Sequence, residues 1–151
     1  MKIRFIIEKI DKLNTWLAVG RIYFMQDSGE QVFEYEAVSG GWAKGPLEPG
    51  LYNITSTISP SEMYSRKDKD AYTRDGIGWF ATLTPLFETD RSALGIHPVG
   101  KRQWRPSTLG CIGIPFKNID DNTRCWNLIS GALEVKGIID VEAIHQLGRV
   151  S

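Results

Sequence analysis

Residues 94–114 read LGIHPVGKRQWRPSTLGCIGI and carry both His97 and Cys111. The chain has two histidines and two cysteines, so this one stretch holds half of each type. Together they can act as a base and a nucleophile, because the thiolate attacks carbonyls readily and a nearby imidazole can take the thiol proton. Gly110 precedes the cysteine and allows its backbone to approach a substrate closely, with N–H groups placed as in an oxyanion hole. Residues 93–97 and 112–114 predict two short strands flanking this loop.

The chain on the amino-terminal side predicts more strands. Ile3, Phe5 and Ile7 alternate with polar residues and would share one face of an extended segment. Residues 26–30 have the composition of a turn, which favours a hairpin between the segments on either side. A stiff bend is expected over residues 45–50, which hold two prolines and two glycines. Further strands are expected at residues 2–8, 15–25, 32–38, 51–55 and 77–83, and a closing strand or hairpin at residues 133–144.

One helix is expected after Pro115, from apolar residues spaced near the helical period. Asn118 or Asp120 would cap its start, and Gly131 would mark its approximate end. We therefore predict a mainly β fold, a sandwich or barrel with one short helix after the cysteine strand. Residues 1–151 are expected to form a single domain. His97 is predicted to lie at a strand end, at the rim of the sheet, because Pro98 would break the ladder.

Charge and hydropathy exclude some classes of function. Eighteen basic residues balance eighteen acidic ones, so electrostatics offer no case for nucleic acid or an anionic membrane as the main partner. The sequence shows no apolar run typical of a signal peptide or of a membrane-spanning helix, so we expect synthesis in the cytoplasm without membrane insertion. Cys111 and Cys125 do not form a disulfide framework, and Cys111 is interpreted as a free thiol.

A metal site is not expected. His97, Cys111, Cys125 and His145 have suitable ligand types for zinc, but structural zinc sites pair their ligands a few residues apart and these are scattered singly. We therefore expect no metal and no cofactor. Cys125 is interpreted as a buried packing residue on the helix.

Two polar segments have open interpretations. Residues 59–78 are crowded with charges around two tyrosines, and form either a solvated excursion or a cover over a substrate groove. In the loop between the two reactive residues, Arg102 or Arg105 can grip a substrate carboxylate, or the loop is only solvated. Trp104 beside them is a candidate wall of the groove.

The orientation of the imidazole also has alternatives. Thr108 or Ser107 would hydrogen-bond to it, or a backbone carbonyl would take the third place of a triad, because no Asp or Asn lies in this motif.

His97, the loop after it and the segment Thr108-Leu109-Gly110-Cys111-Ile112 resemble the catalytic motif of the L,D-transpeptidases (YkuD-like domains). Residues 45–54, GPLEPGLYNI, are similar to the Gly-Pro-x-x-Pro-Gly-x-Tyr start of that domain, especially in type VI secretion effectors and phages. The likeness covers most of residues 20–145. The family commonly has a histidine where Leu109 stands and a substrate- or oxyanion-binding arginine where Gly113 stands.

The resemblance implies the same β fold and a cysteine enzyme that needs no cofactor. Its substrate would be the tetrapeptide stem of peptidoglycan, cut between the diamino acid at the third place and the terminal D-alanine. Hydrolysis, exchange of D-alanine for another D-amino acid, or cross-linking would follow, with the first two expected to outrun the third. Delivery by a secretion machine or by phage lysis would bring the enzyme to the periplasm or wall, with an immunity protein or the secretion apparatus as further partners. The alternative is a non-catalytic peptidoglycan-binding module.

Overall fold

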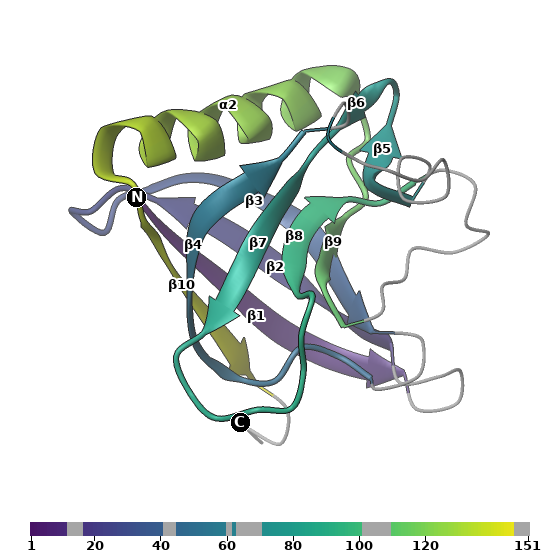
Figure 1. The fold of residues 1–151 in the computed structure, drawn as a ribbon. Helices are drawn as coiled ribbons and strands as arrows, with labels where there is room; N and C mark the ends of the chain where they lie inside the picture. Colours follow the sequence, from purple (N-terminus) through teal and green to yellow (C-terminus); the bar gives the residue numbers. More distant parts are fainter. Residues whose placement is uncertain (12–16, 41–44, 60–61, 63–70, 101–109, 147–151) are drawn as a thin grey trace.

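The computed structural model describes residues 1–11, 17–40, 45–59, 62, 71–100 and 110–146. Eight strands close into a barrel in the order β1-β10-β4-β7-β8-β9-β3-β2 (Figure 1). The barrel strands are β1 (Lys2–Asp11), β2 (Leu17–Met25), β3 (Gln31–Gly40), β4 (Gly50–Ile58), β7 (Phe80–Pro85), β8 (Gly95–Pro98), β9 (Ile112–Ile114) and β10 (Ile139–His145). Outside the barrel, β5 (Thr73–Arg74) and β6 (Ile77–Gly78) pair with each other, and α2 spans Ile119–Lys136. The prediction of a mainly β fold is confirmed, and the barrel is the form it takes.

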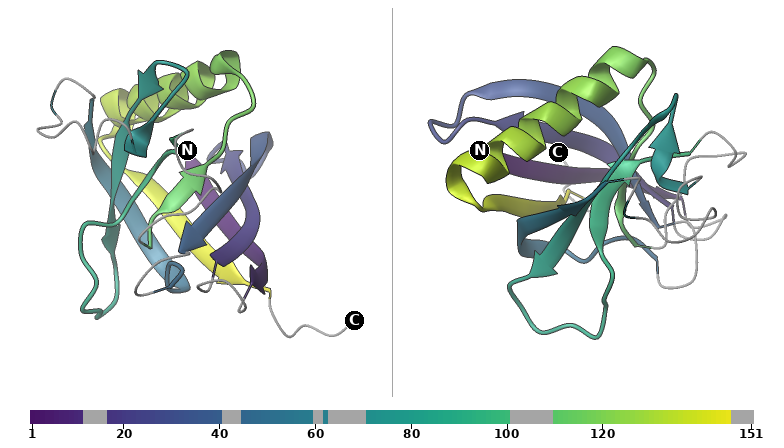
Figure 2. Two further views of the ribbon diagram at one scale, coloured as in Figure 1. Left: turned by 90° about the vertical axis from the view of Figure 1, so that its right-hand side faces the viewer. Right: turned by 45° about the horizontal axis from the view of Figure 1, so that its top comes forward.

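The barrel mixes antiparallel and parallel pairs. The first and last strands close it, because β1 and β10 pair in parallel from Lys2 opposite Asp140 to Ile7 opposite His145. The strands β8 and β9 form the other parallel pair, and the remaining neighbours are antiparallel. The two views of Figure 2 show the same closed wall, with α2 lying across one end of it. A parallel pair needs a long connection, and the connection from β8 to β9 contains the basic loop of residues 101–109.

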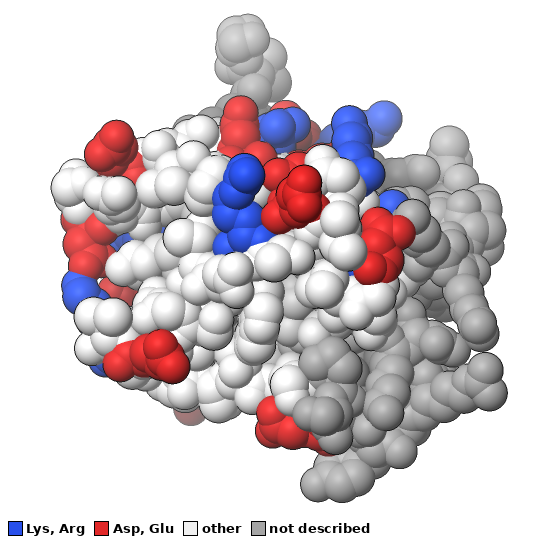
Figure 3. Space-filling model, turned by 90° about the horizontal axis from the view of Figure 1, so that it is seen from above, with Lys and Arg blue, Asp and Glu red and all other residues white. Residues whose placement is uncertain are grey.

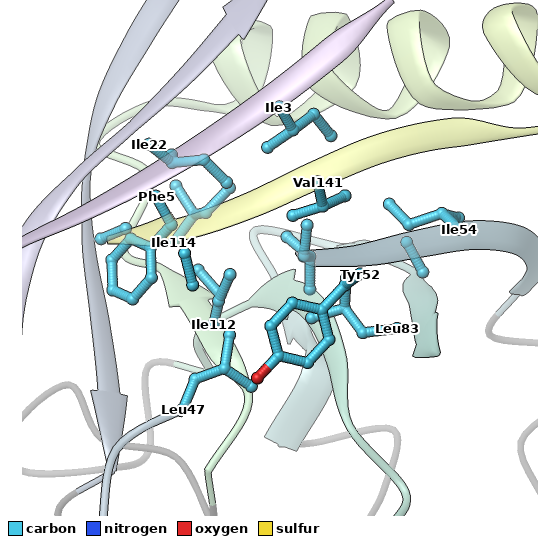
Figure 4. Close-up of a cluster of buried hydrophobic side chains, with 14 of the residues drawn as sticks. Ile3, Phe5, Ile22, Leu47, Tyr52, Ile54, Leu83, Ile112, Ile114 and Val141 are labelled. Carbon is cyan, nitrogen blue, oxygen red and sulfur yellow. The ribbon is translucent and has the colours of Figure 1, made fainter. Parts of the chain in front are cut away.

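Apolar side chains at alternating positions along the strands point inward and fill the interior of the barrel. Ile3, Phe5 and Ile7 are fully buried, as their spacing in β1 predicts. Gly20 of β2 lets the backbones of β1 and β2 approach each other closely, because a Cβ at this position would lie 1.9 Å from the carbonyl oxygen of Ile6. The predicted hairpin between β2 and β3 is confirmed, with Gly29 at a φ of 92° in its turn. Figure 4 shows the resulting core, where side chains from β1, β2, β4, β9 and β10 meet.

The helix α2 is longer than predicted, at 18 residues. Asn118 is the N-cap, and its side chain accepts from the backbone N–H of Asp121 at 2.9 Å. The predicted end at Gly131 is wrong: the helix continues to Lys136 and ends at Gly137, whose φ of 73° is left-handed. A glycine inside a helix costs only about 1 kcal/mol relative to alanine, which tertiary packing readily offsets. The segment over 133–144, predicted as a closing strand or hairpin, is therefore the end of α2 followed by β10.

Trp79 interrupts the strand predicted over residues 77–83. Its indole N–H donates to the side-chain oxygen of Asn122 at 2.8 Å, and its ring stacks on Trp126 with centroids 5.9 Å apart. Both partners belong to α2, so Trp79 ties the wall to the helix and separates β6 from β7. Asn122 also donates to the carbonyl oxygens of Arg74 and Ile77, which holds the β5–β6 pair at the same end.

The outer surface carries both signs of charge. Seen from above, basic and acidic side chains alternate among uncharged ones on the described part of the face that α2 covers (Figure 3). Within the described residues, no helix has the length and apolar character needed to cross a membrane.

Candidate active site

The strands β8 and β9 place His97 and Cys111 on the same side of the barrel wall. Ile96 pairs with Ile112, and both side chains are fully buried in the barrel core. Because side chains alternate along a strand, His97, next to Ile96, points to the outer side. Cys111 directly precedes β9, and its contact with Phe80, which stacks on His97, puts it on the same side. The clustering of buried residues agrees, since Cys111 packs with Phe80 in a cluster separate from the main core. The site therefore lies on the outer face of the wall. His97 is one residue from the end of β8, close to the predicted strand end, but the expectation that Pro98 breaks the ladder is wrong, because Pro98 remains paired with Ile114.

Two aromatic rings enclose this pair. Tyr72 lies over the imidazole of His97 with centroids 4.4 Å apart, and Phe80 of β7 stacks on it at 5.9 Å with an interplanar angle of 10°. Phe80 also packs with Cys111, and Tyr72 packs against this cluster. His97 is 3% exposed and Cys111 5%, so thiol and imidazole share a nearly dry apolar compartment.

Gly95 makes room for this enclosure. A Cβ at this position would lie 2.3 Å from the ring of Phe80, far inside contact distance. Gly95 pairs with Thr82 of β7, so the neighbouring strand presents the ring directly across it. The glycine two residues before His97 is thus required by close packing of an aromatic ring.

The imidazole is held as a neutral base. Its Nδ1 lies 2.7 Å from the carbonyl oxygen of Pro98. A carbonyl only accepts, so we assign the proton to Nδ1, which makes Nε2 the atom with a lone pair. Burial lowers the pKa of His97 to about 4, against the weaker opposing effect of the Pro98 hydrogen bond. A backbone carbonyl, one of the predicted alternatives, thus contacts the imidazole at Nδ1 and leaves Nε2 as the basic atom.

The thiol is held in its protonated form. Cys111 Sγ donates to the carbonyl oxygen of Ala93 at 3.6 Å, and Ala93 has a left-handed φ of 56°, uncommon for a residue with a Cβ. Burial raises the pKa of Cys111 to about 11, while a backbone hydrogen bond with Gly95 acts in the opposite direction. A neutral thiol beside a neutral imidazole can react only if the proton moves to the base as sulfur attacks.

The peptide before the cysteine is fixed by β3. The carbonyl oxygen of Gly110 accepts from the hydroxyl of Ser39 at 3.5 Å, and that hydroxyl accepts from the backbone N–H of Leu47 at 2.8 Å. In a trans peptide the carbonyl and the following N–H point in opposite directions. Ser39 therefore sets the direction of the Cys111 N–H, which is the candidate oxyanion donor. Gly110 has a φ of 114°, a conformation that favours glycine.

The loop of residues 45–49 packs behind this peptide. Arg91, whose side chain is 17% exposed, donates from Nη1 to the carbonyl oxygen of Pro46 and pairs with Glu48 at 3.6 Å. A Cβ on Gly110 would lie 3.7 Å from Arg91 Nη1. His145 contacts the carbonyl oxygen of Leu47 at 3.2 Å. The segment that resembles the start of the family domain thus supports the cysteine turn in this structure.

Of the residues predicted for the site, the structure places His97 on β8 and Gly110 and Cys111 just before its partner β9, with His97 and Cys111 both against Phe80. Five others lie outside the described residues: Arg102, Trp104, Arg105, Ser107 and Thr108. Gly113 pairs with His97 on the same outer face and contributes no side chain there. Cys125 is fully buried in α2, as its interpretation as a packing residue predicts.

Sequence reasoning missed four contributors: Ser39, Tyr72, Phe80 and Arg91. Ser39, Tyr72 and Phe80 come from segments far from residues 94–114, and tertiary contacts bring all four to the site. Of the four, only Tyr72 lies in the charged interval for which a cover over a groove is one expectation.

Among the described residues, no three His, Cys, Asp or Glu side chains gather in a way that would hold a metal ion. Comparison of the chain with protein-family models, with curated proteins and with solved structures finds no match.

Proposed function

We propose that this protein is a cysteine enzyme that transfers acyl groups from peptide bonds, with Cys111 as nucleophile and His97 as base. The observation that carries the proposal is that His97 of β8 and Cys111, just before β9, both contact one ring, that of Phe80, on the outer side of these paired strands. The assigned tautomer of His97 supports it, because Nε2 is the basic atom.

The reaction begins when Cys111 Sγ attacks a bound peptide carbonyl. A carbon–sulfur bond forms while the thiol proton passes to Nε2 of His97, and the carbonyl oxygen becomes an oxyanion facing the Cys111 N–H. The intermediate then collapses: the carbon–nitrogen bond breaks, and the imidazolium returns its proton to the leaving amine. A thioester remains. Water or a second amine, deprotonated by His97, attacks the thioester and restores the thiol.

The proposed substrate is the tetrapeptide stem of peptidoglycan, because the motif around Cys111 is similar to that of the L,D-transpeptidases. The leaving amine is then the terminal D-alanine. We place hydrolysis to the tripeptide and exchange with free D-amino acids ahead of cross-linking. The enclosure by Tyr72 and Phe80 supports this order, since a closely covered thioester admits water or a single amino acid more easily than a second stem.

The proposed setting is antibacterial or phage-related, as in the family versions with the Gly-Pro-x-x-Pro-Gly-x-Tyr segment. The enzyme would act in the periplasm or wall after delivery by a secretion apparatus or phage lysis. In the first case a cognate immunity protein would protect the producer.

The test uses purified protein and tetrapeptide muropeptides, with D-alanine release followed by mass spectrometry. Wild type and Cys125→Ala should release D-alanine, whereas Cys111→Ala should not. Adding excess D-methionine should convert part of the tripeptide product into the exchanged tetrapeptide. A product mixture dominated by cross-linked dimers would contradict the proposed order of acceptors.

A second candidate is a binding module that recognises wall peptides without turnover. It is favoured by Gly113, which offers no cationic side chain to the face of His97. The same samples decide between the two: retention on insoluble peptidoglycan without any D-alanine release would establish the module.

A further inference from the structure

We infer that Tyr72 is a positioning residue for the pair His97 and Cys111. This inference rests on the proposed function, because it takes the thiol and imidazole as the reacting groups. It concerns a side chain from outside the barrel wall that contacts the imidazole directly and packs against the cluster of Phe80 and Cys111.

Tyr72 completes a layered contact with the imidazole. Its ring centroid is 4.4 Å from that of His97 and 5.1 Å from that of Phe80, so the three rings pack on one another. The imidazole is also tied through Nδ1 to the Pro98 carbonyl oxygen. A planar ring that is held at one edge can still turn about that contact. The flanking aromatic rings restrict this turning and so fix the direction of Nε2.

The backbone on either side of Tyr72 is held by hydrogen bonds to residues that follow β8 and β9. The residue before it, Ala71, accepts a hydrogen bond from the backbone N–H of Gly100 at 3.1 Å. Two residues after it, Arg74 donates to the carbonyl oxygens of Val99 and Phe116, which follow β8 and β9. Tyr72 is thus anchored to the ends of the two strands that carry the reactive residues, and moves with them.

Tyr72 also keeps water from the pair. It packs against the Phe80–Cys111 cluster, where the thiol is 5% exposed, and against the imidazole, which is 3% exposed. Burial disfavours the charged forms of both groups, and the Tyr72 ring contributes to that burial. Removing the ring should admit water, bring both pKa values closer to their ordinary range and leave the imidazole loosely oriented.

Other titratable or charged groups on the elements around His97 do not supply this effect. The strands β7, β9 and β6 carry none. Among the residues that the structure describes, the remaining groups are the Cys111 thiol, the Tyr72 hydroxyl, and Arg74 and Asp75 of the β5–β6 hairpin. The low pKa of His97 has burial as its largest cause.

The test compares Tyr72→Leu, Tyr72→Phe and wild type in two assays. The first is the rate at which iodoacetamide alkylates Cys111 at pH 8, read by mass spectrometry with buried Cys125 as an internal measure of unfolding. The second is D-alanine release from tetrapeptide muropeptides. Tyr72→Leu should alkylate about tenfold faster or more, because its thiol ionises more easily. Its turnover should fall about tenfold to a hundredfold, mainly in kcat, because the base is misdirected.

Faster alkylation together with slower turnover in Tyr72→Leu is the result that identifies Tyr72 as a positioning residue. Tyr72→Phe keeps the ring and should reverse both changes seen in Tyr72→Leu. Faster alkylation together with faster turnover would show a passive cover and overturn the inference, as would no change in either assay. Alkylation of Cys125 in Tyr72→Leu would signal unfolding. The decision would then rest on Tyr72→Phe, where loss of protection or turnover overturns the inference.

Failure of the proposed function itself looks different. In that case wild type releases no D-alanine, while the alkylation assay still reports whether Tyr72 shields Cys111.

Discussion

The Nδ1 atom of His97 lies 2.7 Å from the carbonyl oxygen of Pro98, its neighbour in the chain. This contact within one strand has the same role as the carboxylate in many catalytic triads, because it selects the tautomer in which Nε2 is basic. Unlike a carboxylate, a carbonyl gives little stabilisation to the imidazolium form. Together with burial, this predicts a pair that is neutral at rest.

The pH dependence of activity should reveal that neutral pair. With the pKa of His97 lowered to about 4 and that of Cys111 raised to about 11, kcat/KM should be flat between these limits. It should fall at the acid side only as His97 becomes protonated. Measurement of D-alanine release from pH 4 to 9 checks this, with circular dichroism at each pH to confirm folding. An acid limb at 6.5, the ordinary value for histidine, would show an imidazole in contact with water.

Stability should also depend on His97. Its pKa is lowered on folding from 6.5 to about 4, so between these values the unfolded chain binds more protons than the folded one. Stability is therefore fully present above pH 6.5 and is lost as pH falls toward 4. The loss from this one group is about 3 kcal/mol. Urea unfolding at a series of pH values should show the slope, and His97→Gln should flatten it. An equal slope in the variant would refute the assignment.

Gly95→Ala should damage the site through Phe80. The added Cβ would meet the ring at 2.3 Å, so the ring must move away from His97. We expect a cost of about 1–3 kcal/mol in unfolding free energy and a loss of turnover. Gly131→Ala is the matched control, because its Cβ would meet nothing within 4 Å, and it should stabilise α2 by up to about 1 kcal/mol. Thermal unfolding and D-alanine release measured on both variants test this pair.

Sequence reasoning succeeded where local pattern decides the structure. Ile3, Phe5 and Ile7 alternate and are buried, and Asn118 caps the helix that follows the cysteine strand. It failed where tertiary contacts override local preference. Gly131 did not end the helix, because α2 packs across the end of the barrel and Gly137 supplies the left-handed cap.

The candidate site shows the same division. His97 and Cys111 were found because their residue types and glycine neighbours carry chemical meaning. Phe80 reaches the site through the pairing of β7 with β8, Tyr72 through the hydrogen bonds of Ala71 and Arg74 to residues that follow β8 and β9, and Arg91 through its contacts with Pro46 and Glu48. The outer position of His97 depends on the same pairing, since a short strand can present either face.

If the proposed substrate is right, the toxicity of the protein to a host cell should depend on the compartment in which it is expressed. Expression in the cytoplasm of a Gram-negative host should be harmless, because the wall lies outside the inner membrane. Adding a secretory leader should slow growth or lyse the cells, and Cys111→Ala should remove this effect. Growth curves at matched levels of folded protein give the result. Equal growth with and without the leader would argue against a wall substrate.

The central claim is that Cys111 carries the acyl group during turnover. The direct measurement is to quench the reaction with tetrapeptide muropeptides in acid, digest the protein and locate the adduct by mass spectrometry. We predict the tripeptide acyl mass on the peptide that contains Cys111, in wild type and in Cys125→Ala, and none in Cys111→Ala. Undiminished D-alanine release by Cys111→Ala, or an adduct on another residue, would contradict the account.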